Sequence, residues 1–529
     1  ATARPQPTLA KIVATVGPAS RDPATLRRLV DAGVAVFRLN LSHGTLEDHA
    51  RSVGAIRAVA RSASLPIAIL GDLPGPKIRL GNAPEAGVPL YVGYQVLIDP
   101  LFEGSGCCLN GVGRFGCTYK HLSADVKPGH RVLISDGTIR LRAIDRAPGD
   151  PASSVRCILE AGPPERGGEG EGGTPPAVLI RARKGVNLPD SNLSELGAMT
   201  ARDWELAQWC VGEGVDMLAL SFVRSAGDVA ALQDALRGMT SARFEQDHGE
   251  PAETPVIAKI ETPQAVADLE SIVRQADGIM VARGDLGVEM DLWDVPIIQR
   301  RLIEQAGAWG KPCIVATQML ESMITSPVPT RAEVGDVATA VLDHADAVML
   351  SGETAAGAYP VEAVEYMRRT IAAAEAYSAA RVTAPTPPAR LIAAQHRIVA
   401  LAHGAWHIAR DVQARLVVCW SQTGGLARCL AQTGFSIPIV AYSSSPRHTR
   451  RMALYRGVRP LVGTVPDNPT ESLALWNDAV DAELIARGWA KAGDPVVLIA
   501  GRPLGAPHVA GTVAVHYVGN PGTGFRAHS

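Results

Sequence analysis

The chain has few aromatic residues, few cysteines and almost no net charge. Aromatic residues make up 5% of its 529 residues, which disfavours an aromatic-rich β-sandwich and, beside 52 glycines and 38 prolines, favours an α/β protein. Lysine and arginine number 51 and aspartate and glutamate 53, so the net charge is −2 and nucleic acid is not an expected partner. The eight cysteines include no C-x-x-C pair, which argues against a disulfide framework and a structural zinc site.

Long hydrophobic runs are also missing. The first residues, Ala1 to Pro5, contain no apolar signal-peptide core, and no later run approaches the length of a membrane span. We therefore expect a cytoplasmic protein without a membrane partner. At 47% hydrophobic residues, the chain can still bury a large core, and its length allows two to four domains.

Eight short apolar runs rich in β-branched residues dominate the first two thirds of the chain. Continuous apolar runs of this length are typical of strands buried on both faces of a parallel sheet. Most are separated by helix-like segments, so the pattern predicts a (β/α)8 barrel. The runs are Lys11–Gly17, Val34–Asn40, Ile67–Leu73, Met217–Val223, Pro255–Ile260, Gly278–Arg283, Pro312–Gln318 and Ala347–Gly352.

The third and fourth runs are separated by about 140 residues, too many for a loop, and this segment contains strand-like pieces of its own. It is therefore expected to be an inserted β domain, in which Gly162–Pro176 is a flexible loop. A proline-rich linker, Thr383–Pro388, precedes a second α/β region with three further apolar runs. The expected domains are the barrel (1–80 and 182–380), the insertion (81–181) and the C-terminal α/β domain (381–529).

Polar residues cluster where the predicted barrel strands end. Alternation along a strand places Lys259 with Glu261 on one face, and Arg283 with Asp285 on another. The C-terminal strand ends of such a barrel build one shared mouth. A salt-bridge plug would explain any single pair, but six strands with polar ends favour an active site, because burying so many charges is costly.

The residue types narrow the chemistry. The carboxylates of Glu261 and Asp285 suit a hard divalent cation, which prefers oxygen ligands. The cationic Arg38 and Lys259 suit phosphate oxygens, and a metal with a lysine is a common clamp on a transferring phosphoryl group. The sequence has no Walker A motif and no G-x-S-x-G motif, so neither a P-loop nor a nucleophile elbow is expected.

Nine segments, in order, match one known family. They are Arg38–Gly44, Asp72–Arg79, Lys184–Pro189, Ser221–Arg224, Ala258–Glu261, Ile279–Gly287, Ala316–Glu321, Pro329–Glu333 and Met349–Thr354. On these motifs the chain resembles the pyruvate kinases, from about residue 10 into the C-terminal region. The resemblance implies a barrel, a mobile β-barrel lid inserted after the third strand, and a C-terminal effector and oligomerisation domain, commonly in a homotetramer.

The same resemblance implies the reaction and its participants. It implies transfer of a phosphoryl group from phosphoenolpyruvate to ADP, giving pyruvate and ATP, with Mg2+ or Mn2+ as cofactor, as the last step of glycolysis. Implied as catalytic are Lys259, Thr317 and Arg38, with Thr317 on the route that protonates the enolate; the substrate would contact Arg38, Lys259, Gly284, Asp285 and Thr317. Glu261 and Asp285 would hold the metal, and Asn40, Ser42, His43, Arg79 and Lys184 would contact the nucleotide.

One loop departs from the pattern of many relatives. Leu73, Pro74 and Lys77 stand where K+-dependent relatives have threonine, lysine and glutamate. Because an ammonium repels a nearby K+, the resemblance suggests that Lys77 replaces the K+ charge, so we expect K+-independent activity. The alternative is that Lys77 points into solvent. The residues that would form the vestigial cation site are Asn40, Ser42, Asp72 and Leu73.

Several other features of the sequence are less specific. The loop Ser421–Leu426 lies where the family binds an effector phosphate, and it fits a sugar monophosphate, AMP, or no effector. The Gly111–Gly116 segment fits G-x-G-x-x-G but lacks a strand–helix context, and the pair His403 and His407 lacks a third metal ligand.

Two alternative functions fit the sequence less well. A carbon–carbon lyase of the related barrel superfamily would lack the lid and Lys184, and a catalytically dead relative would have lost residues such as Lys259.

Overall fold

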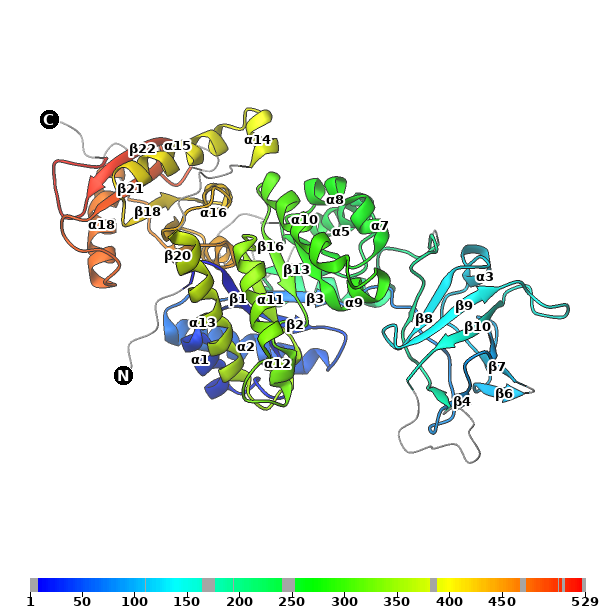
Figure 1. Ribbon diagram of the computed structural model, residues 1–529. Coiled ribbons are helices and arrows are strands. Elements are labelled where there is room, and N and C mark those ends of the chain that lie inside the picture. The colour runs from blue at the N-terminus through cyan, green and yellow to red at the C-terminus, as the bar shows by residue number, and fades with distance from the viewer. Residues whose placement is uncertain are drawn as a thin grey trace.

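The structure is a computed structural model that describes residues 8–109, 111–163, 177–193, 195–239, 253–380, 388–466, 472–502, 504–506 and 510–525. A closed barrel lies at the centre, with the inserted β region on one side and the C-terminal α/β region on the other (Figure 1). Most of the expected flexible loop and of the expected linker, residues 164–176 and 383–387, lie outside the described residues.

The eight predicted apolar runs form the barrel, which confirms the predicted fold class. Its strand order is β1-β17-β16-β15-β14-β13-β3-β2, and every described pairing is parallel. The strands are β1 (Lys11–Val16), β2 (Val34–Asn40), β3 (Ala68–Leu73), β13 (Met217–Leu220), β14 (Val256–Ile260), β15 (Gly278–Ala282), β16 (Cys313–Ala316) and β17 (Ala347–Leu350). Each strand lies within its predicted run or matches it, so the sequence located the sheet to within a few residues.

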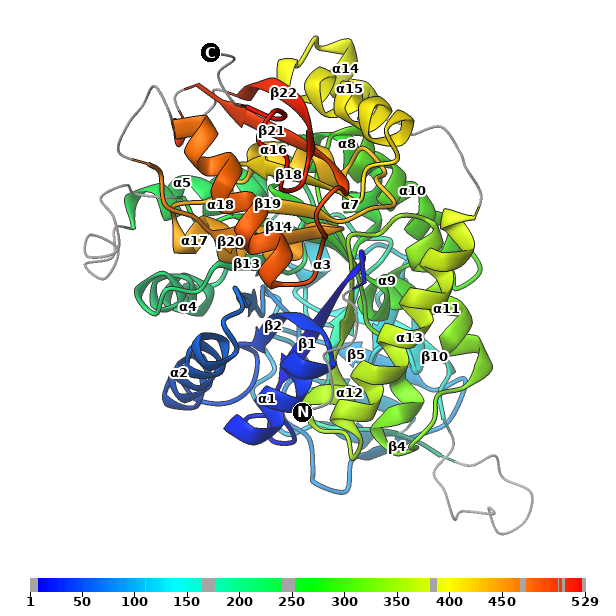
Figure 2. The same ribbon diagram turned by 90° about the vertical axis from the view of Figure 1, so that its left-hand side faces the viewer.

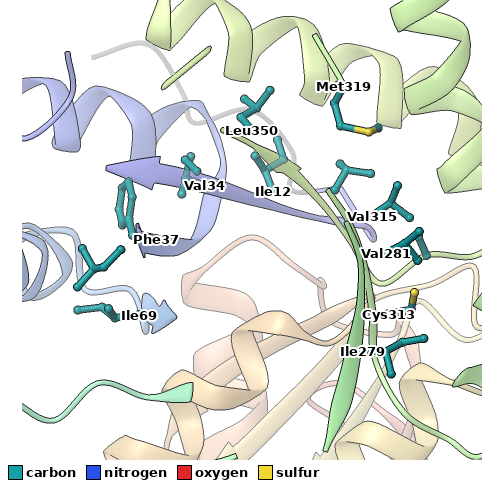
Figure 3. Close-up of a cluster of buried hydrophobic side chains, with 14 of the residues drawn as sticks. Ile12, Val34, Phe37, Ile69, Ile279, Val281, Cys313, Val315, Met319 and Leu350 are labelled. Atoms are coloured by element: carbon teal, nitrogen blue, oxygen red, sulfur yellow. The ribbon is translucent and has the colours of Figure 1, made fainter. Parts of the chain in front are cut away.

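Alternate residues of the barrel strands face two separate cores. Val13 and Ile314 belong to the cluster that fills the barrel, while their neighbours Ile12 and Val315 belong to the outer cluster under the helices. Figure 3 shows part of the outer cluster, with Phe37 among the aliphatic side chains. Both faces of each strand are therefore buried, which explains the continuous apolar runs.

Helices cover the barrel strands. Several of them begin with a capping box, among them those that start at Thr45 with Asp48, Thr200 with Asp203, and Thr330 with Glu333. The helices are α1 (Pro23–Ala32), α2 (Leu46–Ala63), α4 (Ala201–Gly212), α5 (Ala226–Gly238), α7 (Pro263–Ala267), α8 (Leu269–Gln275), α9 (Arg283–Glu289), α10 (Val295–Ala308), η1 (Glu321–Ile324), α11 (Arg331–Leu342), α12 (Gly352–Ala355) and α13 (Pro360–Ala379).

The insertion between β3 and β13 is built of short strands around its own core. Its elements are β4 (Val88–Leu90), β5 (Gln95–Ile98), β6 (Cys107–Leu109), β7 (Val112–Phe115), α3 (Leu122–Asp125), β8 (Arg131–Ile134), β9 (Ile139–Ile144), β10 (Val155–Ala161), β11 (Val178–Ile180) and β12 (Val186–Asn187). Within the described residues, the expected β-barrel takes the form of a seven-stranded sheet, β12-β8-β9-β10-β5-β7-β6, and a β11-β4 pair packed on one core. The G-x-G-x-x-G segment falls on β7 of this sheet.

The C-terminal region is a five-stranded sheet with helices on both faces. Its order is β20-β19-β18-β21-β22, with only β22 antiparallel to its described neighbour. The elements are α14 (Ala389–Ala393), α15 (Arg397–Asp411), β18 (Leu416–Trp420), α16 (Gly425–Ala431), β19 (Ile439–Ser443), α17 (Pro446–Arg451), η2 (Met452–Leu454), β20 (Val458–Val462), α18 (Ser472–Ala486), β21 (Pro495–Gly501) and β22 (Ala510–Tyr517). Figure 2 shows this sheet in front of the barrel.

The imidazoles of His403 and His407 on α15 lie 3.3 Å apart, and no group of three or more possible metal-ligating His, Cys, Asp or Glu residues occurs in the described part of the chain. None of its described helices is both long enough and apolar enough to cross a bilayer.

Candidate active site

A buried ammonium group lies at the centre of the barrel mouth. Lys259, near the end of β14, is 9% exposed, and its Nζ lies 2.8 Å from Glu261 Oε1 and 3.4 Å from Asp72 Oδ1. The same ammonium donates a hydrogen bond to Ser221 Oγ at 2.8 Å. Burial lowers the pKa of Lys259, but the carboxylates of Asp72 and Glu261 outweigh burial and raise it above its usual value. The lysine therefore stays charged although it is removed from water.

Arg38 forms the second cationic group of this network. On β2, its Nε donates to Asp72 Oδ2 at 2.6 Å, and one terminal nitrogen donates to Thr15 Oγ1 at 3.2 Å. Burial raises the pKa of Asp72, but Lys259 and Arg38 outweigh this effect and hold it below its usual value. The ionised Asp72 thus orients two cations that come from different strands.

Glu261 and Asp285 are the two carboxylates that could hold a divalent cation. Glu261 is fully buried, and its Oε2 accepts a hydrogen bond from the Phe222 amide at 2.8 Å. Its Oε1 pairs with Lys259 and accepts no other hydrogen bond in the described residues. Burial raises the pKa of Glu261, Lys259 opposes the rise, and Asp285 adds to it. A divalent cation would relieve this repulsion, so the two carboxylates fit such an ion.

Gly284 and Thr317 are brought together at the neighbouring strand ends. The Gly284 amide, in the first turn of α9, donates to Thr317 Oγ1 at 2.7 Å. Thr317 follows β16 with φ of 68°, and Gln318 has φ of 54°, so two successive non-glycine residues adopt the left-handed conformation. The Arg283 guanidinium donates to the carbonyl oxygens of both, at 2.8 and 2.7 Å. Arg283 thereby holds a strained turn that positions the Thr317 hydroxyl.

Lys77 faces two carboxylates. Its Nζ lies 3.4 Å from Asp136 of the insertion and 3.9 Å from Asp285 of α9, and its side chain is 30% exposed. Among the described residues, Lys77 forms no ion pair with Asp72. Its charge thus lies beside the candidate metal carboxylate, and the alternative of a lysine directed only into solvent does not describe these contacts.

The expected nucleotide residues fall into two groups. In the turn after β2, Asn40 Oδ1 accepts a hydrogen bond from the Ser42 amide at 3.3 Å, and the His43 carbonyl contacts His49 Nε2 at 2.8 Å. In the second group, at the junction with the insertion, Arg79 donates to the Arg183 carbonyl at 3.2 Å. The carbonyl of Lys184 accepts a hydrogen bond from the Leu80 amide at 2.9 Å. Both chain segments that connect the barrel to the insertion thus carry a cationic side chain that is predicted to contact the nucleotide.

Four residues of the site were not singled out for a role by the sequence. Ser221 accepts from Lys259 and contacts Asp72 Oδ1 at 3.4 Å, and Phe222, with φ of 55°, turns its amide toward Glu261. Glu289 accepts a hydrogen bond from Asn187 Nδ2 at 2.7 Å, and burial raises the pKa of Glu289 to about 7. Ser221, Phe222 and Asn187 lie in matched motifs, which were the only available signal, whereas Glu289 lies outside them.

Two family models and several known proteins match this chain. Residues 8–364 match a family model described as the pyruvate kinase barrel domain, and residues 399–516 match the pyruvate kinase alpha/beta domain. The chain is 37% identical to a pyruvate kinase of Mycobacterium tuberculosis (96% of this chain, 98% of the other) and 38% identical to one of Agrobacterium vitis (93% and 95%). A crystal structure of a pyruvate kinase from Cryptosporidium parvum matches with a TM-score of 0.83 and 30% identity, covering 97% of this chain and 96% of that one.

Proposed function

Since this chain belongs to the pyruvate kinase family and is an enzyme with pyruvate kinase activity, we propose that the residues at its barrel mouth carry this reaction as follows. The observation that carries the proposal is the buried Lys259 ammonium, held between Asp72 and Glu261 at 3.4 and 2.8 Å. A cation fixed in a site of low dielectric stabilises the charge that spreads over a transferring phosphoryl group.

The substrate phosphate and the substrate carboxylate bind at opposite sides of this lysine. Arg38, oriented by Asp72, binds phosphate oxygens, and Lys259 contacts the migrating group. The amides of Gly284 and Asp285, with the Thr317 hydroxyl, bind the carboxylate. Because the Gly284 amide donates to Thr317 Oγ1 at 2.7 Å in this structure, substrate binding exchanges that hydrogen bond for one to the carboxylate.

The proposed reaction transfers one phosphoryl group and then one proton. The bond between phosphorus and the enol oxygen breaks, a bond forms between phosphorus and a terminal oxygen of ADP, and the enolate carbon then takes up a proton. Thr317 lies on the proton route, and Arg283 holds its backbone in place. Glu261 and Asp285 would hold Mg2+ or Mn2+, which neutralises charge on the substrate oxygens when bound. Asn40, Ser42, His43, Arg79 and Lys184 contact the nucleotide.

The proposed roles of the three domains and of the effector follow from the family resemblance. Residues 81–181 act as the lid, residues 1–80 with 182–380 as the catalytic domain, and residues 381–529 as the effector and oligomerisation domain of a homotetramer. At the loop Ser421–Leu426 the proposed effector is a sugar monophosphate or AMP, and the alternative is that no effector binds there.

Activity is further proposed not to require K+. The support is that Lys77 brings a positive charge to within 3.9 Å of Asp285, beside the site where substrate anions gather. A second cation there is repelled by the lysine. Asn40, Ser42, Asp72 and Leu73 then form a vestigial cation site.

The test is pyruvate formation from phosphoenolpyruvate, ADP and Mg2+ in a buffer free of K+ and NH4+, repeated with K+ added. High activity in both buffers is the expected result. Activity only with K+ would retain the reaction and reject the role of Lys77. A folded protein that forms no pyruvate in either buffer, with candidate activators present, would reject the proposed catalytic roles.

A further inference from the structure

A cavity lies near the start of strand β3, at the opposite end of that strand from the catalytic residues. The cavity of about 660 Å³ lies between helix α2 with the segment leading into β3, and the C-terminal elements β18, β19, β20 and α18. It is lined by Ser64 and Pro66, just before β3 begins, whereas Asp72 lies at the other end of that strand. Its volume falls in the usual range for small-molecule sites, roughly 300–1,000 Å³.

Three aromatic side chains form one wall of this cavity. Trp420 and Tyr442 are stacked at 6.3 Å with an interplanar angle of 8°, and Trp476 packs edge-on against both at 6.1 and 5.9 Å. Gly463 lines the same cavity, and a Cβ there would lie 3.0 Å from both Trp420 and Tyr442. The backbone thus passes close to the rings at a position where a larger side chain would collide with them.

Two polar atoms of this wall are buried and unpaired. Tyr442 is 7% exposed and Trp476 is 2% exposed, yet Tyr442 Oη and Trp476 Nε1 form no hydrogen bond with any described residue. Leaving a buried polar group unpaired costs on the order of 1–3 kcal/mol, so each such group requires an explanation. Both can donate a hydrogen bond, so a ligand with acceptor oxygens would satisfy them.

The rest of the lining carries an excess of positive charge. Arg57, Arg61, Arg450 and Arg487 line the cavity. Asp216, which is fully buried and does not line the cavity, pairs with two of them, Arg57 at 2.7 Å and Arg450 at 2.8 Å. Glu483 pairs with Arg487. The Arg61 side chain forms no hydrogen bond or ion pair within the described ranges, so four guanidinium groups are balanced by two carboxylates.

We propose that this cavity binds a phosphorylated small metabolite with a ring, its phosphate on the arginines and its ring and hydroxyl groups on the aromatic wall. Guanidinium groups are the usual partners of phosphate, and aromatic faces are the usual partners of sugars and bases. This site differs from the predicted effector loop at Ser421–Leu426, where the described residues enclose a cavity of only about 30 Å³.

The cavity is also connected to the strands that carry catalytic residues. Arg57 donates to the Ile67 carbonyl at 3.0 Å, and Asp216 accepts from the Ile69 amide at 2.8 Å. Ile69 lies on β3, which ends near Asp72, and Asp216 precedes β13, which ends near Ser221. A ligand phosphate that competes with Asp216 for its arginines would act at the start of both strands.

The test is calorimetric titration of the full chain at fixed ionic strength with inorganic phosphate, a hexose monophosphate and a nucleoside monophosphate. At least one organic phosphate is expected to bind tenfold or more tightly than inorganic phosphate, and the comparison between the two organic ligands identifies the class. Arg61→Gln should weaken this binding about tenfold, and Tyr442→Phe should weaken it by a smaller factor.

The matched control is Arg51→Gln, because Arg51 lies on the same helix, is 73% exposed and pairs with Asp48 away from the cavity. Unchanged binding is expected for this variant. Thr423→Val tests the loop site, and the proposal is rejected if Thr423→Val abolishes binding while Arg61→Gln does not. Equal affinity for all three ligands would also reject it, because that result describes a general anion effect.

Discussion

The Lys259 side chain combines burial with charge. Its ammonium is 9% exposed and contacts two carboxylates and a hydroxyl, so its orientation is set before any substrate arrives. Positioning and electrostatic stabilisation are what phosphoryl transfer requires of a protein. We therefore predict that Lys259→Met reduces kcat by at least about 10³-fold while the Kd for phosphoenolpyruvate changes little.

Steady-state kinetics together with equilibrium binding separate these two quantities. The control is Lys491→Met, because Lys491 is exposed and lies in the C-terminal region, where the same change in charge should leave kcat unaltered. A kcat near that of the unsubstituted enzyme would show that the ammonium does not stabilise the transferring group.

Glu289 supplies a prediction about pH. It is 7% exposed, and burial raises its pKa to about 7, above the ordinary value of 4.5. Between these values the unfolded chain loses a proton that the folded chain keeps, so this residue makes the protein less stable as pH rises from 4.5 to 7. Glu289→Gln keeps an acceptor for Asn187 and removes the titration.

The expected result is that Glu289→Gln and the unsubstituted protein are similarly stable at pH 4.5. By pH 7 the variant should be more stable by about 2–3 kcal/mol, measured by urea denaturation across that range. A stability difference that is the same at both pH values would mean that folding does not raise the pKa of Glu289, contrary to its burial.

At the scale of elements, the segment after β3 depends on one glycine. Gly75 has φ of 69°, and a Cβ there would lie 3.0 Å from the Ser221 carbonyl. Alanine at this position would be strained and would displace Ser221, which accepts a hydrogen bond from Lys259. We predict that Gly75→Ala costs about 1–3 kcal/mol of stability and lowers kcat/KM.

The matched control for this substitution is Gly54→Ala. Gly54 lies exposed in the interior of helix α2, where an added Cβ meets nothing within 4 Å. That variant should gain roughly 0.5–1 kcal/mol, because alanine is the better helix former, and its kinetics should not change. Equal thermal shifts for the two variants would contradict the argument from conformation.

The elements also show which features a sequence can predict. The barrel strands were located because burial on both faces makes each one a continuous apolar run, as in β14 and β15. The charged strand ends were found because parallel strands bring their carboxyl ends together. Strands of the insertion such as β6 and β7 have only three and four residues, which leaves little periodicity to detect.

Other features depend on contacts between distant segments. Glu289 meets Asn187 across 102 positions, and Phe222 turns its amide to Glu261 through a backbone conformation that phenylalanine rarely adopts. No local pattern encodes either contact. The direction of Lys77 toward Asp136 and Asp285 likewise depends on how the insertion sits against the barrel. Sequence therefore identified the charged groups of the site, and the structure supplied their partners.

At the scale of the whole molecule, Asp216 joins the barrel to the C-terminal region. This fully buried carboxylate pairs with Arg57 of α2 at 2.7 Å and with Arg450 of α17 at 2.8 Å, and Arg451 donates to its carbonyl oxygen at 3.1 Å. Burial raises the pKa of Asp216, but the two paired arginines outweigh burial and lower it. One ionised residue thus balances cations from two regions, and its partner Arg450 lies 234 residues further along the chain.

Asp216→Asn tests how far this junction holds the two regions together. The substitution keeps the shape of the side chain but leaves the two guanidinium groups without their shared charge, and breaking a buried pair in this way costs about 3–5 kcal/mol. Urea denaturation should show a loss of that size, and amide hydrogen exchange in β19 and α17 should accelerate because these elements lose their link to the barrel. Asp234→Asn, which removes an exposed pair with Arg237, should change stability by less than about 0.5 kcal/mol. If the two variants lose the same stability, Asp216 is one contact among many and the regions are joined by apolar packing instead.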